Sequence, residues 1–261
     1  MFLPIEFTGW VGARRESQLR QPPRRGTLCR VESTSLGADS DSRFTARLRL
    51  DPIGPAMAAD LWLVQGDDEV WPWYGTEKPS LEQARQRAKL MGDAWRFHGV
   101  HKWMAYDRVS SEVVGRGGLS RPPVDDDWGQ IDEFLPAEPW VRTAYEIRRP
   151  FIAHANWLEI GWALRRKFWG RGYAAEIGRA GLAFAFDVLQ AQAVVSCTVR
   201  HNLRSRAVME RIGMQYAGEI RSRGMAGAAG GERDDAPFAV CVLLRSDWGG
   251  AAARRRRPIN G

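Results

Sequence analysis

The stretch RRKFWGRGYAAEIGRAGLAFAFD, Arg165–Asp187, decides the fold because it joins a glycine-rich turn to a helix. Gly170 and Gly172 flank Arg171, and small and apolar residues at helical spacing follow them. The start of a helix leaves backbone N–H groups unpaired and carries the positive end of the helix dipole. Glycines at that point let a ligand approach the backbone closely, so the stretch predicts an anion site.

Segments on both sides of this stretch predict a strand–helix–strand unit. Residues 156–164 (NWLEIGWAL) precede it with a strand pattern, and residues 193–200 (AVVSCTVR) follow it as a β-branched strand that we expect to be buried. A second helix is predicted to begin at Asn202, which would serve as its N-cap. Residues 237–245 predict a last strand, after a flexible loop over 221–236.

The N-terminal half predicts further strands and helices. Apolar and polar residues alternate over 44–53 as in a strand. Residues 80–97 predict a helix that begins with a capping box of Ser80 and Gln83 and has its apolar residues along one face. A hairpin is predicted over 101–120. This order of elements predicts one α+β domain, a mixed and mostly antiparallel sheet of about seven strands with helices on both faces.

Composition divides the chain into four parts. Residues 1–43 are rich in Arg, Ser, Pro and Gly without a sustained period, which predicts a poorly ordered N-terminal extension. The folded domain is expected over 44–246, interrupted by a long, acidic, proline-rich insertion at 121–155. Residues 247–261 predict a flexible, Arg-rich C-terminal tail.

Charge and cysteine content exclude several classes of function. The net charge of +7 lies mostly in the two ends of the chain, so a nucleic-acid partner is unlikely. Cys29, Cys197 and Cys241 form neither a disulfide framework nor metal-site spacing, which favours a reduced, cytoplasmic setting and no metal. No apolar run is long enough to span a membrane, and the N-terminus lacks the pattern of a secretory signal.

Four segments taken together closely resemble the GNAT superfamily of acyl-CoA-dependent N-acetyltransferases: EIGWAL, KFWGRGYAAE, AFAFD and VRHNLRSRAVMERIGM. FTARLRLDPI and VVGRGGLS also fit its RimJ/RimL-like branch, named for ribosomal-protein N-terminal acetyltransferases, and the resemblance covers residues 44–245. It implies a sheet splayed at the cofactor site and acetyl-CoA as co-substrate. The acetyl group would pass to a primary amine by direct attack in a ternary complex.

The resemblance also implies where acetyl-CoA binds. Its pyrophosphate would contact backbone N–H groups of the loop 167–172, and its pantetheine arm would pair with the backbone of residues 162–164. Asn202 matches an asparagine that contacts the pantetheine or acetyl region, although it is also a plain N-cap. The complete set of contacts implied is Trp162, Ala163, Leu164, Lys167, Phe168, Trp169, Gly170, Arg171, Gly172, Tyr173, Ala174, Asn202 and Ser205.

Two residues are candidates for proton transfer. Glu159 matches a glutamate that acts as a base, directly or through water, while the alternative is a structural glutamate paired with a nearby arginine. Ser205 stands at the position for a contact with the leaving thiolate. Many family members place a tyrosine one helical turn later, where this chain has Met209, which cannot donate a proton.

The acceptor is less defined. Trp71, Trp73 and Tyr74 lie in a segment that lines the acceptor pocket in similar proteins, and core packing is an equal alternative. The acidic insertion at 121–155 would attract a cationic acceptor, such as a protein N-terminal amine, a polyamine or an aminoglycoside, unless its acids only keep a loop solvated. We expect a monomer or homodimer. A non-catalytic acyl-CoA-binding or interaction module with this fold is the alternative function.

Overall fold

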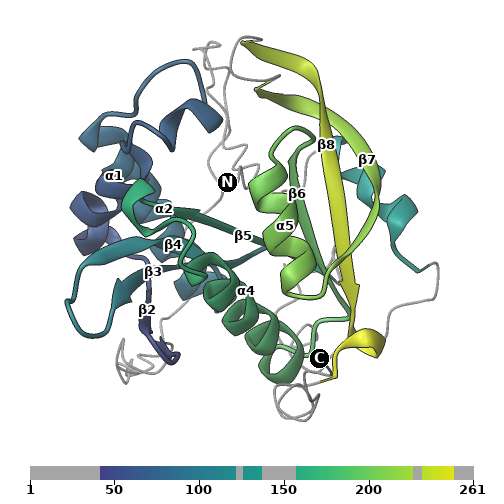
Figure 1. The fold of residues 1–261 in the computed structure, drawn as a ribbon, viewed down its shortest axis with the longest axis horizontal. Coiled ribbons are helices and arrows are strands. Elements are labelled where there is room, and N and C mark those ends of the chain that lie inside the picture. Colours follow the sequence, from purple (N-terminus) through teal and green to yellow (C-terminus); the bar gives the residue numbers. More distant parts are fainter. Residues whose placement is uncertain (1–41, 122–125, 137–156, 226–230, 250–261) are drawn as a thin grey trace, which may run out of the picture.

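The computed structural model describes residues 42–121, 126–136, 157–225 and 231–249 (Figure 1). Nearly all of the expected N-terminal extension, much of the acidic insertion and most of the expected tail therefore lie outside the described residues.

An open sheet runs through the molecule, and all its neighbouring strands are antiparallel except β5 and β6. Its spatial order is β1-β2-β3-β4-β5-β6-β8-β7. The strands are β1 (Arg43–Phe44), β2 (Leu48–Pro52), β3 (Lys102–Asp107), β4 (Val113–Ser120), β5 (Trp157–Leu164), β6 (Ala193–Val199), β7 (Gln215–Met225) and β8 (Glu232–Leu244). This mixed α+β sheet confirms the predicted fold class, with eight strands in place of about seven.

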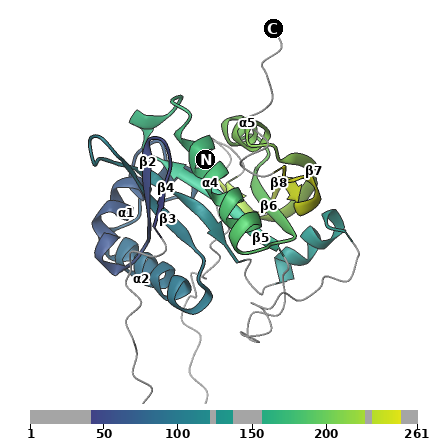
Figure 2. The same ribbon diagram turned by 90° about the horizontal axis from the view of Figure 1, so that it is seen from below.

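Helices cover both faces of the sheet (Figure 2). One face carries α1 (Ala58–Gln65) and α2 (Leu81–His98), and the other carries α4 (Tyr173–Ala183) and α5 (Leu203–Arg211). The 3₁₀-helices are η1 (Pro55–Met57), η2 (Trp71–Trp73), η3 (Asp126–Phe134), η5 (Arg166–Phe168) and η7 (Arg245–Asp247). A π-helical segment, η6 (Phe184–Val188), follows α4 directly. The predicted capping box at the start of α2 is confirmed, because Ser80 and Gln83 exchange both hydrogen bonds.

Two sequence predictions for strands were wrong. The pattern over 44–53 is not one strand, because the chain turns after β1 and leaves Phe44 66% exposed. The loop predicted over 221–236 is mostly a long hairpin, in which β7 and β8 continue to Met225 and from Glu232. Alternation shows which side chains share a face, but it does not show where the chain reverses.

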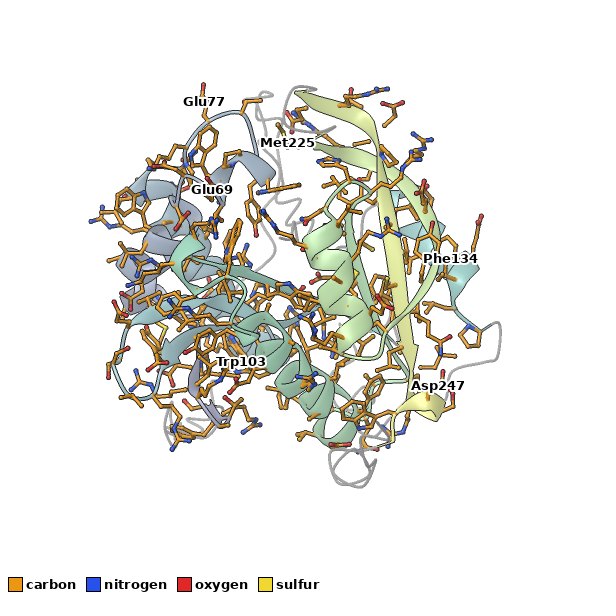
Figure 3. All side chains as sticks on the ribbon, in the orientation of Figure 1. Glu69, Glu77, Trp103, Phe134, Met225 and Asp247 are labelled. Carbon is orange, nitrogen blue, oxygen red and sulfur yellow. The ribbon has the colours of Figure 1, made fainter. Side chains whose placement is uncertain are left out.

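Parts of the expected insertion and tail pack against the sheet. In η3, the amide of Gln130 pairs with the backbone N–H and C=O of Arg221, and Phe134 lies against Gly218 of β7 (Figure 3). After β8, the Trp248 ring stacks on Phe186 with ring centres 5.4 Å apart. The described part of the fold therefore extends to residue 249. At the edge of the sheet, η3 packs against β7.

β5 and β6 separate after a short parallel pairing. Trp157–Glu159 pair with Ala193–Val195, and beyond this point β5 pairs only with β4 while β6 pairs only with β8. The hydroxyl of Ser196 donates to the Ile160 carbonyl at 2.7 Å, one residue beyond the last backbone-paired positions of the two strands. The separation leaves room between the ends of two neighbouring strands in the middle of the sheet.

The packing of α4 on β4 depends on Gly117. A Cβ at this position would lie 2.6 Å from Cγ2 of Ile177 and 2.9 Å from the Gly161 carbonyl oxygen. We predict that Gly117→Ala lowers the free energy of unfolding by about 1–3 kcal/mol, because a well-packed core accepts an added methyl only by shifting. Gly54→Ala is the control, since nothing lies within 4 Å of a Cβ there. Equal stability of the two variants in urea denaturation would contradict this account.

Candidate active site

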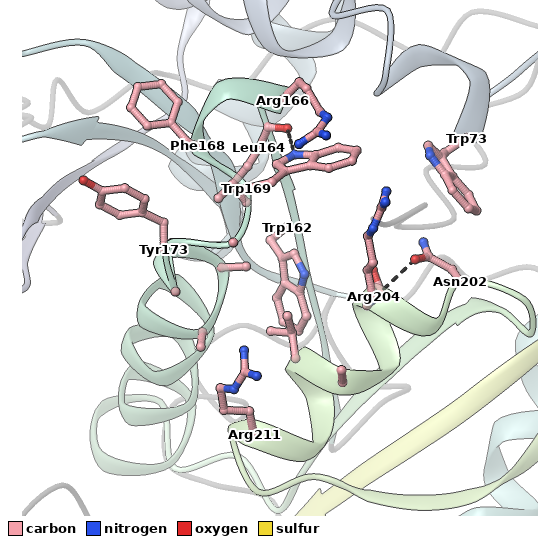
Figure 4. Close-up of a pocket in the computed structure, with 17 residues that line it drawn as sticks. Trp73, Trp162, Leu164, Arg166, Phe168, Trp169, Tyr173, Asn202, Arg204 and Arg211 are labelled. Atoms are coloured by element: carbon pink, nitrogen blue, oxygen red, sulfur yellow. Dashed lines mark hydrogen bonds between the residues drawn. The ribbon is translucent and has the colours of Figure 1, made fainter.

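A cavity of about 430 Å³ opens where β5 and β6 separate (Figure 4). Its walls come from the end of β5, the turn η5, the first turn of α4, one face of α5 and Trp73 of η2. Most of the residues predicted to contact a cofactor line this cavity, namely Trp162, Leu164, Phe168, Trp169, Gly170, Gly172, Tyr173, Ala174, Asn202 and Ser205. Sequence positions more than 40 residues apart are thus brought into one site.

The glycine-rich turn lies directly before α4, where the sequence predicted a helix start. Gly170 and Gly172 have φ values of +73° and +78°, a left-handed region that favours glycine. Gly172 is the N-cap of α4 and offers no side chain to bond the first-turn N–H groups. Those N–H groups are therefore available to a ligand, together with the positive end of the helix dipole.

Three contacts hold the preceding turn in place. The backbone N–H of Arg166 donates to Asp67 at 2.9 Å, and Lys167 forms an ion pair with Glu112. The indole N–H of Trp169 donates to the Leu164 carbonyl at 2.7 Å. The loop is thus positioned by the protein itself before any ligand binds.

Tyr173, the first residue of α4, is fixed by Asp107 at the end of β3. The Tyr173 hydroxyl donates to Asp107 at 2.8 Å. The backbone N–H of Ser110 and this hydroxyl lower the pKa of Asp107 to about 2, and the same carboxylate raises the pKa of Tyr173. The pair keeps the tyrosine ring against the turn at neutral pH.

The start of α5 supplies the opposite wall. The side chain of Asn202 accepts a hydrogen bond from the Ser205 N–H at 3.2 Å, which confirms the predicted N-cap. Both residues are 2% exposed and line the cavity. His201 just before them stacks on Trp73, with ring centres 5.4 Å apart, and burial lowers the pKa of this histidine. The stack joins α5 to the segment before α2.

Three arginines also line the cavity, and its described lining holds no carboxylate. Arg166 and Arg204, both labelled in Figure 4, have their guanidinium carbons 5.0 Å and 5.1 Å from the centre of the Trp169 ring. Sequence reasoning missed Arg204 and Arg211 as site residues. Their spacing with Val208 at helical positions i, i+4 and i+7 is the signal that would have placed them on one face of α5.

Other predicted site residues lie off this cavity. The side chain of Ala163 is fully buried on the opposite face of β5, among residues of α1 and α2. Lys167 and Arg171 do not line the cavity, nor do Trp71 and Tyr74. The Tyr74 ring instead lies 5.6 Å from the guanidinium carbon of buried Arg116, so this part of the expected aromatic wall packs inward.

Glu159 lies on the same opposite face of β5 and is also absent from the cavity wall. Its Oε2 pairs with Lys102 of β3 and accepts a hydrogen bond from Ser120 at 2.7 Å, while Lys102 also donates to the Gly118 carbonyl. Glu159 Oε1 is buried without a hydrogen-bond partner among the described residues. The ion-pair partner that sequence reasoning considered was an arginine, and the structure supplies a lysine.

A family model described as an acetyltransferase (GNAT) domain matches residues 47–215, more than half of the chain. The chain belongs to the GNAT acetyltransferase family. The match includes the glycine-rich turn, both strands that separate and the start of α5. The family resemblance inferred from sequence is thereby confirmed, and its branch is not settled by this match.

Two curated relatives are similar over much of the GNAT region. The uncharacterized protein YkkB of Bacillus subtilis is 27% identical over 178 residues, covering 68% of this chain and 87% of its own. The FsC-acetyl coenzyme A-N(2)-transacetylase of Aspergillus fumigatus is 26% identical over 174 residues, covering 66% of this chain. The match spans 64% of the fungal protein, less than two thirds of its length.

Solved structures support the fold alone. An acetyltransferase from Vibrio fischeri, named for the alanine of ribosomal protein S5, superposes with a TM-score of 0.57 over 79% of this chain and 98% of its own, at 12% identity. A putative GNAT-family acetyltransferase from Bordetella pertussis gives 0.56 over 78% and 99%, at 22% identity.

The described residues contain neither a metal site nor a membrane-spanning helix. No cluster of three His, Cys, Asp or Glu side chains there has the arrangement of a metal site. Within the same residues, no helix has the length and hydropathy needed to cross a membrane.

The buried pair of Lys102 and Glu159 gives a stability prediction. Lys102→Met should lower the free energy of unfolding by about 3–5 kcal/mol, because it leaves a buried carboxylate without its cation. The double variant Lys102→Met, Glu159→Gln should recover part of this loss. Lys89→Met removes the exposed pair with Asp93 and should cost less than about 1 kcal/mol. Chemical denaturation compares the three variants, and equal losses for the two lysines would refute the prediction.

Proposed function

We propose that the protein is an acetyl-CoA-dependent N-acetyltransferase that moves an acetyl group to a primary amine by direct attack in a ternary complex. One observation carries the proposal: the cavity at the β5–β6 separation combines an uncapped helix start with arginines and no carboxylate among its described lining. Phosphate groups are bound by such N-termini and by guanidinium groups.

The lining of the cavity fits the two chemical parts of acetyl-CoA. Gly170, Gly172 and the first-turn N–H groups of α4 suit its pyrophosphate, and Arg166 and Arg204 add positive charge. The apolar side chains of Trp162 and Val208 suit its long, weakly polar arm. The open edge of β5 over residues 162–164 offers backbone groups to that arm. These residues would bind and orient the donor.

Transfer to an amine requires removal of a proton from the ammonium group, which has no lone pair. We keep Glu159 as the proposed base. Lys102 and Ser120 occupy its Oε2, so its Oε1 is the oxygen left to receive the proton through water. Ser205 lies buried at the cavity wall and is proposed to contact the thioester sulfur.

We propose that Trp73, which lines the cavity from η2, contacts the acceptor amine. Within the RimJ/RimL-like branch the acceptor would be a protein N-terminal amine, and a cationic small molecule such as a polyamine or aminoglycoside is the other choice. The name of the fungal relative, an N(2)-transacetylase, gives acetyl coenzyme A as its donor. We further propose a cytoplasmic setting, because Cys197 and Cys241 are free thiols. We also propose that the protein is a monomer or a homodimer.

Acetyl-CoA-dependent release of thiol from purified protein tests this function, screened across N-terminal peptides, polyamines and aminoglycosides. Release with one acceptor class is the expected result.

Gly172→Val should raise the Kd of acetyl-CoA more than about tenfold, because valine disfavours the left-handed conformation at the loop. Gly75→Val is the matched control, since a Cβ there meets nothing within 4 Å. Donor binding by calorimetry without release for any acceptor would favour the non-catalytic acyl-CoA-binding module.

Glu159→Gln tests the proposed base. We expect kcat to fall by about 10²–10⁴-fold, because glutamine cannot accept the proton. The Kd of acetyl-CoA should stay within about twofold, since Glu159 lies off the cavity wall. Thermal unfolding of the variant serves as the folding control. Unchanged turnover in a folded variant would exclude Glu159 as the base.

A further inference from the structure

One of the side chains that hold the glycine-rich loop from outside is Arg47, in the turn between β1 and β2. Its Nη1 donates to the Arg171 carbonyl at 2.9 Å, and its Nε donates to Glu176 of α4 at 2.7 Å. Its guanidinium carbon lies 4.2 Å from the centre of the Tyr173 ring. Arg47 therefore touches the residues on both sides of Gly172.

The bond to Arg171 fixes the direction of a backbone N–H group. In a planar trans peptide, the C=O of one residue and the N–H of the next point in opposite directions. Because the Arg171 carbonyl points to Arg47, the Gly172 N–H points away from Arg47. Gly172 lines the cavity, and a Cβ at this position would lie 3.6 Å from Arg47 Nη2.

The bond to Glu176 removes a charge conflict. Glu176 is the acidic residue in the first turn of α4, where its negative charge would repel an incoming phosphate. Burial would raise the pKa of Glu176, but hydrogen bonds from Thr45 and Arg47 outweigh it and lower that pKa. The carboxylate is thus ionised and is neutralised by the guanidinium group of Arg47, with their atoms 2.6 Å apart.

The turn that carries Arg47 is itself fixed. The Arg47 backbone N–H donates to Glu176 at 2.9 Å, and its carbonyl accepts from the Arg108 N–H at 2.9 Å. The Thr45 hydroxyl donates to Glu176 at 2.6 Å and accepts from the Leu48 N–H at 2.9 Å. These bonds order an otherwise exposed arginine, so its planar fork reaches the carboxylate and the carbonyl together.

We propose that Arg47 is a positioning residue that sets the affinity for the phosphate-bearing donor, by orienting the Gly172 peptide and neutralising Glu176. The inference rests on the proposed function, because it takes the cavity as the donor site. Arg47 acts through the loop and has no part in the chemical step. Its removal should therefore change donor binding and leave turnover at saturation unchanged.

Arg47→Met tests the proposal. We expect the Kd of acetyl-CoA by calorimetry and its KM to rise about tenfold, with kcat and the KM of the acceptor within about twofold. Arg49→Met is the matched control: Arg49 lies two residues along, has a similarly exposed side chain and pairs with Asp51. It should leave donor affinity unchanged.

Two further variants separate the two roles. Arg47→Lys keeps the charge opposite Glu176 but has no planar fork, so it should lose about threefold in affinity. The double variant Arg47→Met, Glu176→Gln should regain about threefold over Arg47→Met, because the repelling charge is gone. Circular dichroism and thermal unfolding confirm that each variant is folded.

The outcomes distinguish this inference from the proposed function. Wild-type protein that neither binds acetyl-CoA nor releases thiol would overturn both. Wild-type protein that binds the donor, with Arg47→Met binding it equally well, would overturn the role of Arg47 alone. A fall in kcat at unchanged donor Kd would also overturn it, since the residue would then act in the chemical step.

Discussion

The separation of β5 from β6 is the constraint on which the rest of this structure depends. Parallel pairing of the two strands ends at Glu159 and Val195. At the next residue along each strand, the Ser196 hydroxyl donates a hydrogen bond to the Ile160 carbonyl. A buried strand edge needs partners for its backbone groups, so an edge left open in the middle of a sheet favours a ligand that supplies them. The cavity lies at this opening, with the starts of α4 and α5 on either side.

β5 itself has two chemically different faces. Trp162 and Leu164 face α4 and α5 and form the apolar wall of the cavity, whereas Glu159 and Ala163 face α1 and α2. Lys102 and Ser120 hold Glu159 on that second face. Under the proposed function, donor binding and proton removal would take place on opposite sides of one strand, in the register that alternation along β5 imposes.

Long-range contacts order the glycine-rich loop and the start of α4. Three segments of the N-terminal half supply these contacts: the β1–β2 turn with Arg47, the loop after α1 with Asp67, and the β3–β4 hairpin with Asp107 and Glu112. A loop ordered before binding loses less entropy when the ligand arrives. The N-terminal half therefore helps to order the glycine-rich loop, although the motif itself lies in the C-terminal half.

The sequence by itself determined the fold class, the strand–helix–strand unit, the glycine-rich turn at a helix start and the N-cap at Asn202, because these follow from local periodicity and local backbone preference. It did not determine the reversal after Phe44 or the β7–β8 hairpin, since alternation is the same before and after a turn. Tertiary structure alone decided that Glu159 pairs with Lys102, 57 residues away in sequence. It alone also decided that Arg47 hydrogen-bonds to the Arg171 carbonyl and to Glu176. Such pairs depend on which strands become neighbours, and local pattern does not encode that.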